Sequence, residues 1–113
     1  TGCPYDRAAN PDNNLAEFVY FMPKTRGVRR AGSAALDLAW LAAGRLDGFW
    51  ERGLNPWDAA AGALMIEEAG GCVTTYAGQP WRPGSRNLLA SNGRLHELML
   101  AGLATARRAL DAG

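Results

Sequence analysis

The sequence has few cysteines, little net charge and no long apolar run, and each of these features excludes a class of protein. It holds 2 cysteines in 113 residues, and Cys3 and Cys72 have neither the spacing of a zinc site nor the density of a disulfide scaffold. With 12 Lys plus Arg against 11 Asp plus Glu the net charge is +1, so no large field directs the chain to nucleic acid or an anionic membrane. Apolar runs break before they reach membrane-spanning length. We expect a cytoplasmic protein that binds neither nucleic acid nor membrane.

The motifs of several enzyme classes are also missing. The chain has 1 histidine, and without a carboxylate neighbour at a candidate site it forms no Ser-His-Asp triad. We expect this residue, His96, to lie on the surface of the last helix. There is no Gly-x-Gly-x-x-Gly sequence and no Walker lysine. Any chemistry must therefore rest on scattered acidic residues and on the starts of helices.

What the chain does have is the pattern of one small mixed domain. Its length and its 48% hydrophobic content suffice for a single core. Periodicity and turn residues predict helices over 11–22, 34–46, 56–69 and beyond Asn92-Gly93, and strands over 28–31, 49–51, 72–76 and 87–91. The helix over 34–46 is apolar on nearly every side, which indicates burial between layers. This alternation favours an α/β fold, a layered sheet with helices on both faces.

One acidic residue has an unusual position. Asp58 falls in the first turn of an Ala-rich helix, where free backbone N–H groups and the helix dipole favour an anion. It could be a structural cap, with Asn55 as the N-cap and Pro56 as the first helical residue. It could also be a ligand of a metal or a substrate. The residue types alone leave both interpretations open.

Two further candidates lie at predicted junctions of strands and helices, where ligands gather in layered sheets. Gly32-Ser33-Ala34 opens a helix, and its ordinary interpretation is a Ser33 N-cap. Glu51 closes an apolar strand, and its ordinary interpretation is a solvated strand end or an ion pair with Arg52. If both sites converge with Asp58, two carboxylates beside a helix N-terminus would suit a phosphorylated, hydroxylated small molecule with Mg²⁺.

These residues resemble a known family. The run from Pro56-Trp57-Asp58 through Gly62 to Glu68-Ala69-Gly70-Gly71 is similar to the C-terminal signature of the inositol monophosphatase family. The stretches 30–37 and 43–48 are similar to the preceding family segment, and residues 1–5 resemble the end of a family strand. The resemblance covers essentially the whole chain. It implies the C-terminal half of an α/β/α/β/α sandwich.

The resemblance implies a Mg²⁺-dependent, lithium-sensitive phosphomonoesterase that hydrolyses myo-inositol monophosphate with a metal-activated water. It implies that Asp58 binds Mg²⁺ and touches the substrate. Gly32, Ser33 and Ala34 would line the inositol site, largely through backbone, and Glu51 would hydrogen-bond a ring hydroxyl. Ser33 stands where many relatives have Thr. The full-length enzyme would be a homodimer.

The family's N-terminal half, with its metal-binding Glu and its Asp-Pro-x-Asp-Gly-Thr motif, is not in this sequence. We therefore expect residues 1–113 to be one C-terminal, substrate-shaping subdomain of a longer enzyme, and to be inactive alone. Phosphatases for histidinol phosphate, fructose bisphosphate or a 3′-phosphonucleotide share the signature and remain alternatives, although Glu51 favours inositol. A non-catalytic interaction module is the alternative from another class.

Overall fold

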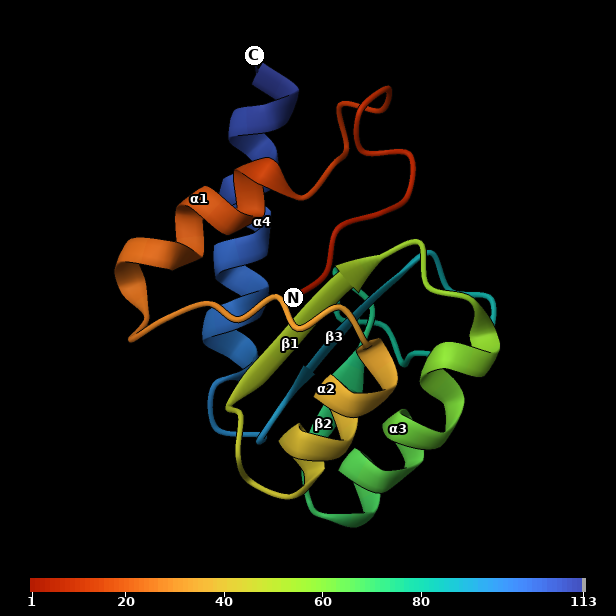
Figure 1. The fold of residues 1–113 in the computed structure, drawn as a ribbon. Coiled ribbons are helices and arrows are strands. Elements are labelled where there is room, and N and C mark those ends of the chain that lie inside the picture. Colours follow the sequence, from red (N-terminus) through yellow and green to blue (C-terminus); the bar gives the residue numbers. More distant parts are fainter. Residues whose placement is uncertain (113) are drawn as a thin grey trace.

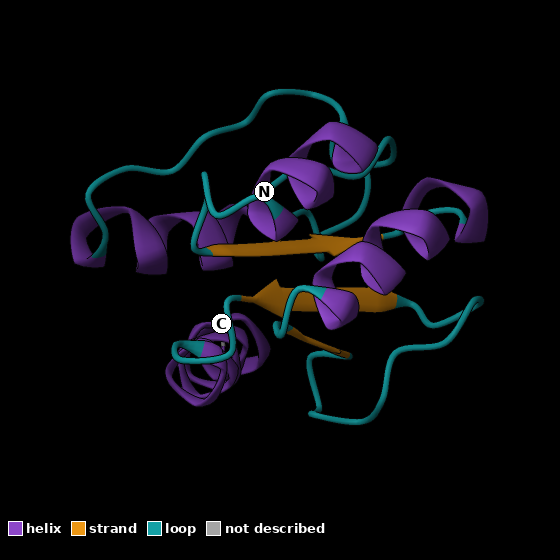
Figure 2. Ribbon diagram, turned by 90° about the horizontal axis from the view of Figure 1, so that it is seen from below, coloured by secondary structure: helices purple, strands orange, loops and turns teal. Residues whose placement is uncertain are grey.

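The computed structural model describes residues 1–112, with side chains as far as Arg108. Strands β1 (Gly48–Arg52), β2 (Cys72–Thr74) and β3 (Asn87–Ser91) form one antiparallel sheet in the order β1-β3-β2. Helices α2 (Ala34–Ala42) and α3 (Pro56–Glu68) pack side by side on one face (Figure 1). On the other face lie α1 (Leu15–Phe21), the short 3-10 helix η1 (Met22–Lys24), and α4 (His96–Ala112), which Figure 2 shows nearly end-on. The predicted layered sheet with helices on both faces is confirmed.

The core has two parts because successive strand residues point to opposite faces of a sheet. On β1, Phe49 faces α2 and α3, and its neighbour Trp50 faces α1 and α4. The first part is built from Leu38, Leu41, Phe49, Ala59, Ala63, Ile66, Val73, Leu88 and Ala90, and the second from Phe21, Trp50, Leu89 and Leu103. The sheet is therefore covered on both sides, and the end of β1 lies between the two cores.

The double glycine after α3 has a definite structural role. Gly70 has a φ of 89°, which glycine adopts without steric cost. The N–H of Gly70 donates to the Glu67 carbonyl, and that of Gly71 to the Ile66 carbonyl at 2.8 Å, the pattern of a Schellman helix end. A Cβ on Gly71 would lie 2.5 Å from the Ser91 carbonyl oxygen. The pair therefore ends α3 and lets the chain pass close to β3.

The helix predicted over 34–46 is shorter and less buried than expected. It ends at Ala42, because Gly44 takes a φ of 82° and the N–H of Arg45 bonds the Trp40 carbonyl, another Schellman end. Burial on every side is wrong, since Leu36 is 52% exposed. Within the described residues only one face of α2 meets the sheet and α3.

Two predictions near the N-terminus are also wrong. Residues 28–31 form no strand, because among the described residues no neighbouring strand lies beside them to pair with their backbone. The backbone nitrogen of Thr1 donates a hydrogen bond to the Arg29 carbonyl. The first helix begins at Leu15 instead of near Pro11. The asparagines before it make local turns, with the Asn13 side chain accepting from the N–H of Leu15.

The last helix, α4, buries one of its faces against the sheet. Leu98 is 71% exposed, whereas Leu103 and Ala106 are buried, because Met99, Leu103 and Ala106 follow the helical spacing that faces the sheet. No helix in the described part of the chain is long and apolar enough to cross a membrane.

His96 is buried, so its predicted surface position is wrong. Its Nδ1 lies 2.8 Å from the Ser91 hydroxyl, and its Nε2 lies 2.8 Å from the Thr74 hydroxyl. Thr74 donates to the Thr75 carbonyl and so accepts from Nε2–H, which leaves Nδ1 to accept from Ser91. The tertiary fold places His96 between β2, β3 and α4.

Acidification should destabilise the fold through His96. Burial lowers the pKa of His96 below 6.5, so the unfolded chain binds more protons in this range, and the free energy of unfolding falls as pH drops below about 6.5. Urea denaturation at about pH 7.5 and about pH 5.5 should show a smaller pH-dependent loss in His96→Gln, which keeps an N–H donor for Thr74. Equal losses in the variant and the unmodified protein would contradict this role.

Candidate functional site

The first turns of α2 and α3 lie on the same side of the molecule, towards the arrowhead of β1 (Figure 1). Glu51 is near the end of β1, and Asp58 is in the first turn of α3. The Asp58 carboxylate lies close enough to Glu51 to help raise the pKa of Glu51. The predicted convergence of Glu51 and Asp58 at one end of the sheet is therefore present in the structure.

Asp58 is placed by the start of α3. Asn55 is the N-cap residue and Pro56 is the first helical residue, but the Asn55 side chain makes no capping hydrogen bond. The N–H of Asp58 donates to the Asn55 carbonyl at 3.0 Å. The Asp58 side chain is partly exposed, and among the described residues no hydrogen bond to its carboxylate is found. Its carboxylate thus sits in the favourable field of the helix start with its oxygens free for another ligand.

Gly32, Ser33 and Ala34 form the start of α2. The Ser33 hydroxyl accepts a hydrogen bond from the N–H of Leu36 at 3.3 Å, so Ser33 is an N-cap. Gly32 has a φ of 90°, and a Cβ built there would meet nothing within 4 Å. The backbone is therefore held in a glycine conformation beside open space. A cap and a backbone contact to a ligand are compatible here.

Glu51 has the most perturbed carboxyl group near this end of the sheet. Burial is the largest of the effects that together raise the pKa of Glu51 to about 7; the carboxylates of Asp37 and Asp58 also raise this pKa, and the positive charge of Arg30 opposes them. Near neutral pH the group can therefore either donate or accept a hydrogen bond. The predicted ion pair with Arg52 is absent from the described residues, since Arg52 pairs with Asp6 at 2.8 Å and with Asp12.

Asp37 belongs to the same group of carboxylates and was not predicted as a site residue. It is 4% exposed, and burial raises its pKa. It lines a shallow cavity of about 380 Å³ together with Arg30 and Trp40. The signal that could have found it is the one used for Asp58, an acidic residue in the first turn of an apolar helix.

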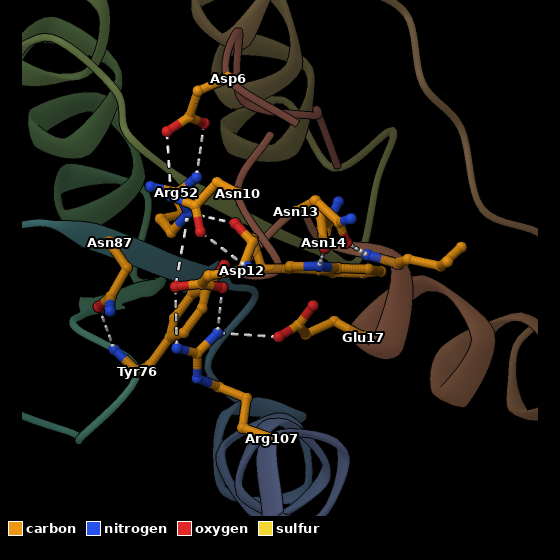
Figure 3. Close-up of polar contacts among 12 residues, drawn as sticks. Asp6, Asn10, Asp12, Asn13, Asn14, Glu17, Arg52, Tyr76, Asn87 and Arg107 are labelled. Atoms are coloured by element: carbon orange, nitrogen blue, oxygen red, sulfur yellow. Dashed lines mark hydrogen bonds and ion pairs between the residues drawn. The ribbon is translucent and has the colours of Figure 1, made fainter. Parts of the chain in front are cut away.

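A polar network ties the N-terminal loop to the other face of the sheet (Figure 3). Arg107 of α4 binds both oxygens of Asp12, at 2.9 and 3.1 Å, and one oxygen of Glu17 at 2.8 Å. Arg107 also lowers the pKa of Asp12 through these hydrogen bonds. Arg52 of β1 joins the network through Asp6 and the Asp12 carbonyl. The network fixes β1, which carries Glu51, against the N-terminal loop.

The residues present can supply part of a hard-cation site. Magnesium prefers oxygen ligands and keeps several waters, and the Asp58 carboxylate is an open oxygen donor at this end of the sheet. Among the residues whose side chains the structure describes, 1–108, no cluster of three or more His, Cys, Asp or Glu side chains could hold a metal. The chemistry of Asp58 therefore fits one ligand of such an ion.

The match to a known family covers nearly the whole chain. The model described as the inositol monophosphatase family matches residues 1–109. The chain belongs to the inositol monophosphatase family. This family placement confirms the resemblance inferred from the Trp57-Asp58 and Gly70-Gly71 motifs.

Individual relatives agree with the family placement. The chain is 51% identical over 104 residues to an inositol-1-monophosphatase of Synechocystis sp., a match that covers 92% of this chain and 36% of that protein. It is 44% identical over 102 residues to a protein of Pseudomonas aeruginosa named Nus factor SuhB, covering 88% of this chain and 38% of that protein. The chain thus spans well under half the length of these relatives.

The fold agrees with solved structures of the inositol monophosphatase family. The structure of inositol monophosphatase from Anabaena (Nostoc) sp. superimposes with a TM-score of 0.89 at 51% identity, covering 92% of this chain and 41% of that one. The Thermotoga maritima inositol monophosphatase gives a TM-score of 0.80 at 35% identity, covering 96% of this chain and 41% of that one. The sheet and helices described above are therefore those of this family.

Proposed function

We propose that the full-length protein hydrolyses the phosphate monoester of a polyol, myo-inositol monophosphate, with Mg²⁺. In this proposal residues 1–113 are its C-terminal subdomain, with the remaining metal ligands and the residues that position the water supplied from outside this chain. The observation that carries the proposal is the family match over residues 1–109, together with Asp58 and Glu51 at one end of the sheet. The names of the curated relatives support the reaction class.

Each candidate residue has a role that its position allows. Asp58 would hold the metal, since its carboxylate oxygens carry no other hydrogen bond within the described residues. Bound Mg²⁺ would supply Lewis-acid stabilisation of charge on the phosphoryl oxygens. Glu51 would orient a hydroxyl of the polyol, because a half-ionised carboxyl can both donate and accept. The start of α2, at Gly32, Ser33 and Ala34, would face the ring through its backbone.

The exposed side chain beside Asp58 supports a larger assembly around this site. Trp57 is 76% exposed, and a tryptophan is highly buried on average. We propose that Trp57 packs against another part of the full-length protein, which then closes the site above Asp58 and excludes water. A homodimer of the full-length protein belongs to the same proposal.

The reaction is tested with the full-length protein and with residues 1–113 prepared alone. We expect Mg²⁺-dependent release of phosphate from myo-inositol monophosphate by the full-length protein, and none by the 113-residue chain, because one carboxylate cannot hold the cation. Histidinol phosphate, fructose bisphosphate and a 3′-phosphonucleotide serve as competing substrates. Higher kcat/KM for one of them would reassign the substrate, and turnover by the chain alone would contradict the subdomain assignment.

A second candidate function is a non-catalytic interaction module. The relative named Nus factor SuhB supports it, since that name describes something other than a phosphatase. The sequence upstream of Thr1 distinguishes the two candidates. An Asp-Pro-x-Asp-Gly-Thr motif and an earlier acidic ligand there favour the enzyme, and their absence favours the interaction module.

A further inference from the structure

The carboxyl group of Glu51 lies directly over the backbone of Gly2. A Cβ built on Gly2 would overlap Glu51 Oε1, would lie 2.7 Å from Cδ and would lie 3.4 Å from Oε2. Real Cβ atoms do not approach other atoms so closely. The Glu51 carboxylate can therefore occupy this position only because residue 2 is a glycine and has no side chain.

The backbone at Gly2 is itself clamped to β1. The Asn14 side-chain amide donates to the Gly2 carbonyl at 2.9 Å and to the Thr1 hydroxyl at 2.9 Å. The Thr1 hydroxyl donates to the Trp50 carbonyl, and the Trp50 indole N–H donates to Asn14 Oδ1 at 2.6 Å. Thr1, Asn14 and Trp50 are all buried. These bonds connect the segment before the first turn to the strand that carries Glu51.

Asn14 has an unusual backbone conformation that serves this clamp. Its φ is 73°, the one positive φ of a non-glycine residue among the described residues, and asparagine tolerates this region better than most residues. Although Asn14 is the N-cap of α1, its side chain makes no capping bond and is used for Gly2, Thr1 and Trp50 instead. The Asn14 side chain therefore holds the N-terminal segment instead of capping the helix.

Trp50 and Glu51 are neighbours on β1, so their side chains point to opposite faces of the sheet. The hydrogen bonds of Asn14 and Trp50 hold Thr1 and Gly2 on the Trp50 side of β1. The Glu51 carboxyl group contacts Gly2 on the other side. Together these contacts set where the Glu51 carboxylate stands relative to Asp37 and Asp58.

We propose that Gly2 and Asn14 are positioning residues that set the polyol specificity of the site by fixing the Glu51 carboxylate. This inference rests on the proposed function. Both residues act through Glu51. Gly2 leaves space for the Glu51 carboxyl group, and Asn14 holds the backbone of Gly2 in place. A side chain at position 2 would push Glu51 away from the polyol and leave the phosphoryl end of the site unchanged.

The test compares two substrates in the full-length protein. Myo-inositol monophosphate carries ring hydroxyls, whereas p-nitrophenyl phosphate has none for Glu51 to contact. Gly2→Ala is expected to lower the ratio of kcat/KM for the inositol ester over the aryl ester by about tenfold or more, the effect of losing one hydrogen bond to a charged group. Gly27→Ala is the matched control, because a Cβ there meets only the flexible end of Arg29 at 3.4 Å.

A double-mutant cycle shows whether Gly2 acts through Glu51. In a Glu51→Ala background the space over position 2 is open, so adding Gly2→Ala should not change the substrate ratio further. Asn14→Asp keeps the acceptor for Trp50 and removes the donor to Gly2, so it should lower the ratio in the same direction even if Gly2→Ala folds poorly.

The outcomes separate this inference from the proposed function. Equal loss for both esters in Gly2→Ala and Asn14→Asp, or additive effects of Gly2→Ala and Glu51→Ala, would overturn the positioning role while leaving the phosphatase assignment standing. No phosphate release from either ester by the unmodified full-length protein would overturn the proposed function and this inference with it.

Discussion

Replacing Asp58 with Asn in the full-length protein is expected to lower kcat by about a hundredfold or more. The substitution keeps the shape of the side chain but removes the charge that would bind Mg²⁺. A catalytic metal contributes several kcal/mol of transition-state stabilisation, and each 1.36 kcal/mol changes the rate about tenfold. Folding should be almost unaffected, because the carboxylate is partly exposed and has no hydrogen bond among the described residues.

Steady-state kinetics at several Mg²⁺ concentrations, with thermal melts followed by circular dichroism, check both halves of this expectation. Asp47→Asn is the matched control, since Asp47 is an exposed residue in the turn before β1. It carries the same chemical change away from the site and should leave kcat unchanged. If Asp58→Asn kept near-normal turnover, Asp58 would be a helix cap and not a metal ligand.

Replacing Arg107 with Met is expected to cause the largest loss of stability. Glu17 is 1% exposed and is paired with Arg107 at 2.8 Å. Removing one partner leaves a buried carboxylate without its counter-ion, which costs about 3–5 kcal/mol. Asp12 loses its two-pronged contact in the same variant, so the N-terminal loop should loosen as well.

Urea denaturation measures this loss as a lower midpoint. Arg108→Met is the matched control, because Arg108 is exposed and its guanidinium contacts only the Thr105 hydroxyl among the described residues. A second change, Glu17→Gln, should restore part of the stability of Arg107→Met by removing the buried charge. A midpoint for Arg107→Met equal to that of Arg108→Met would show that the Glu17 carboxylate finds another partner.

Local patterns in the sequence were sufficient for most of the elements. The strand over 87–91 and the helix that begins at Pro56 are found where they were predicted, because β-branched or apolar runs, proline at a helix start and glycine at a helix end act over a few residues. Two of the predictions that were wrong concern features that depend on distant partners. Residues 28–31 lack a neighbouring strand, and His96 is buried by β2 and β3.

In the candidate site, too, some residues could be predicted from local sequence patterns and others could not. Asp58, Glu51 and Ser33 were predicted from their positions at strand ends and helix starts, which the structure reproduces, and their roles as site residues stay predictions. Asp37 could have been found by the same argument. Gly2 and Asn14 could not, since a glycine in a turn and an asparagine before a helix have ordinary local explanations.

The sequence by itself determined the family, most of the helices and strands, and one carboxylate at the start of α3, since these depend on motifs and short-range periodicity. Only the tertiary structure decided that Glu51 lies over Gly2, that Asn14 holds Trp50 across 36 positions, and that Arg107 pairs with Glu17 across 90. The physical reason is that such contacts join residues far apart in the chain. The spacing of residue types in the sequence does not reveal that the backbone at Gly2 leaves room for the Glu51 carboxyl group.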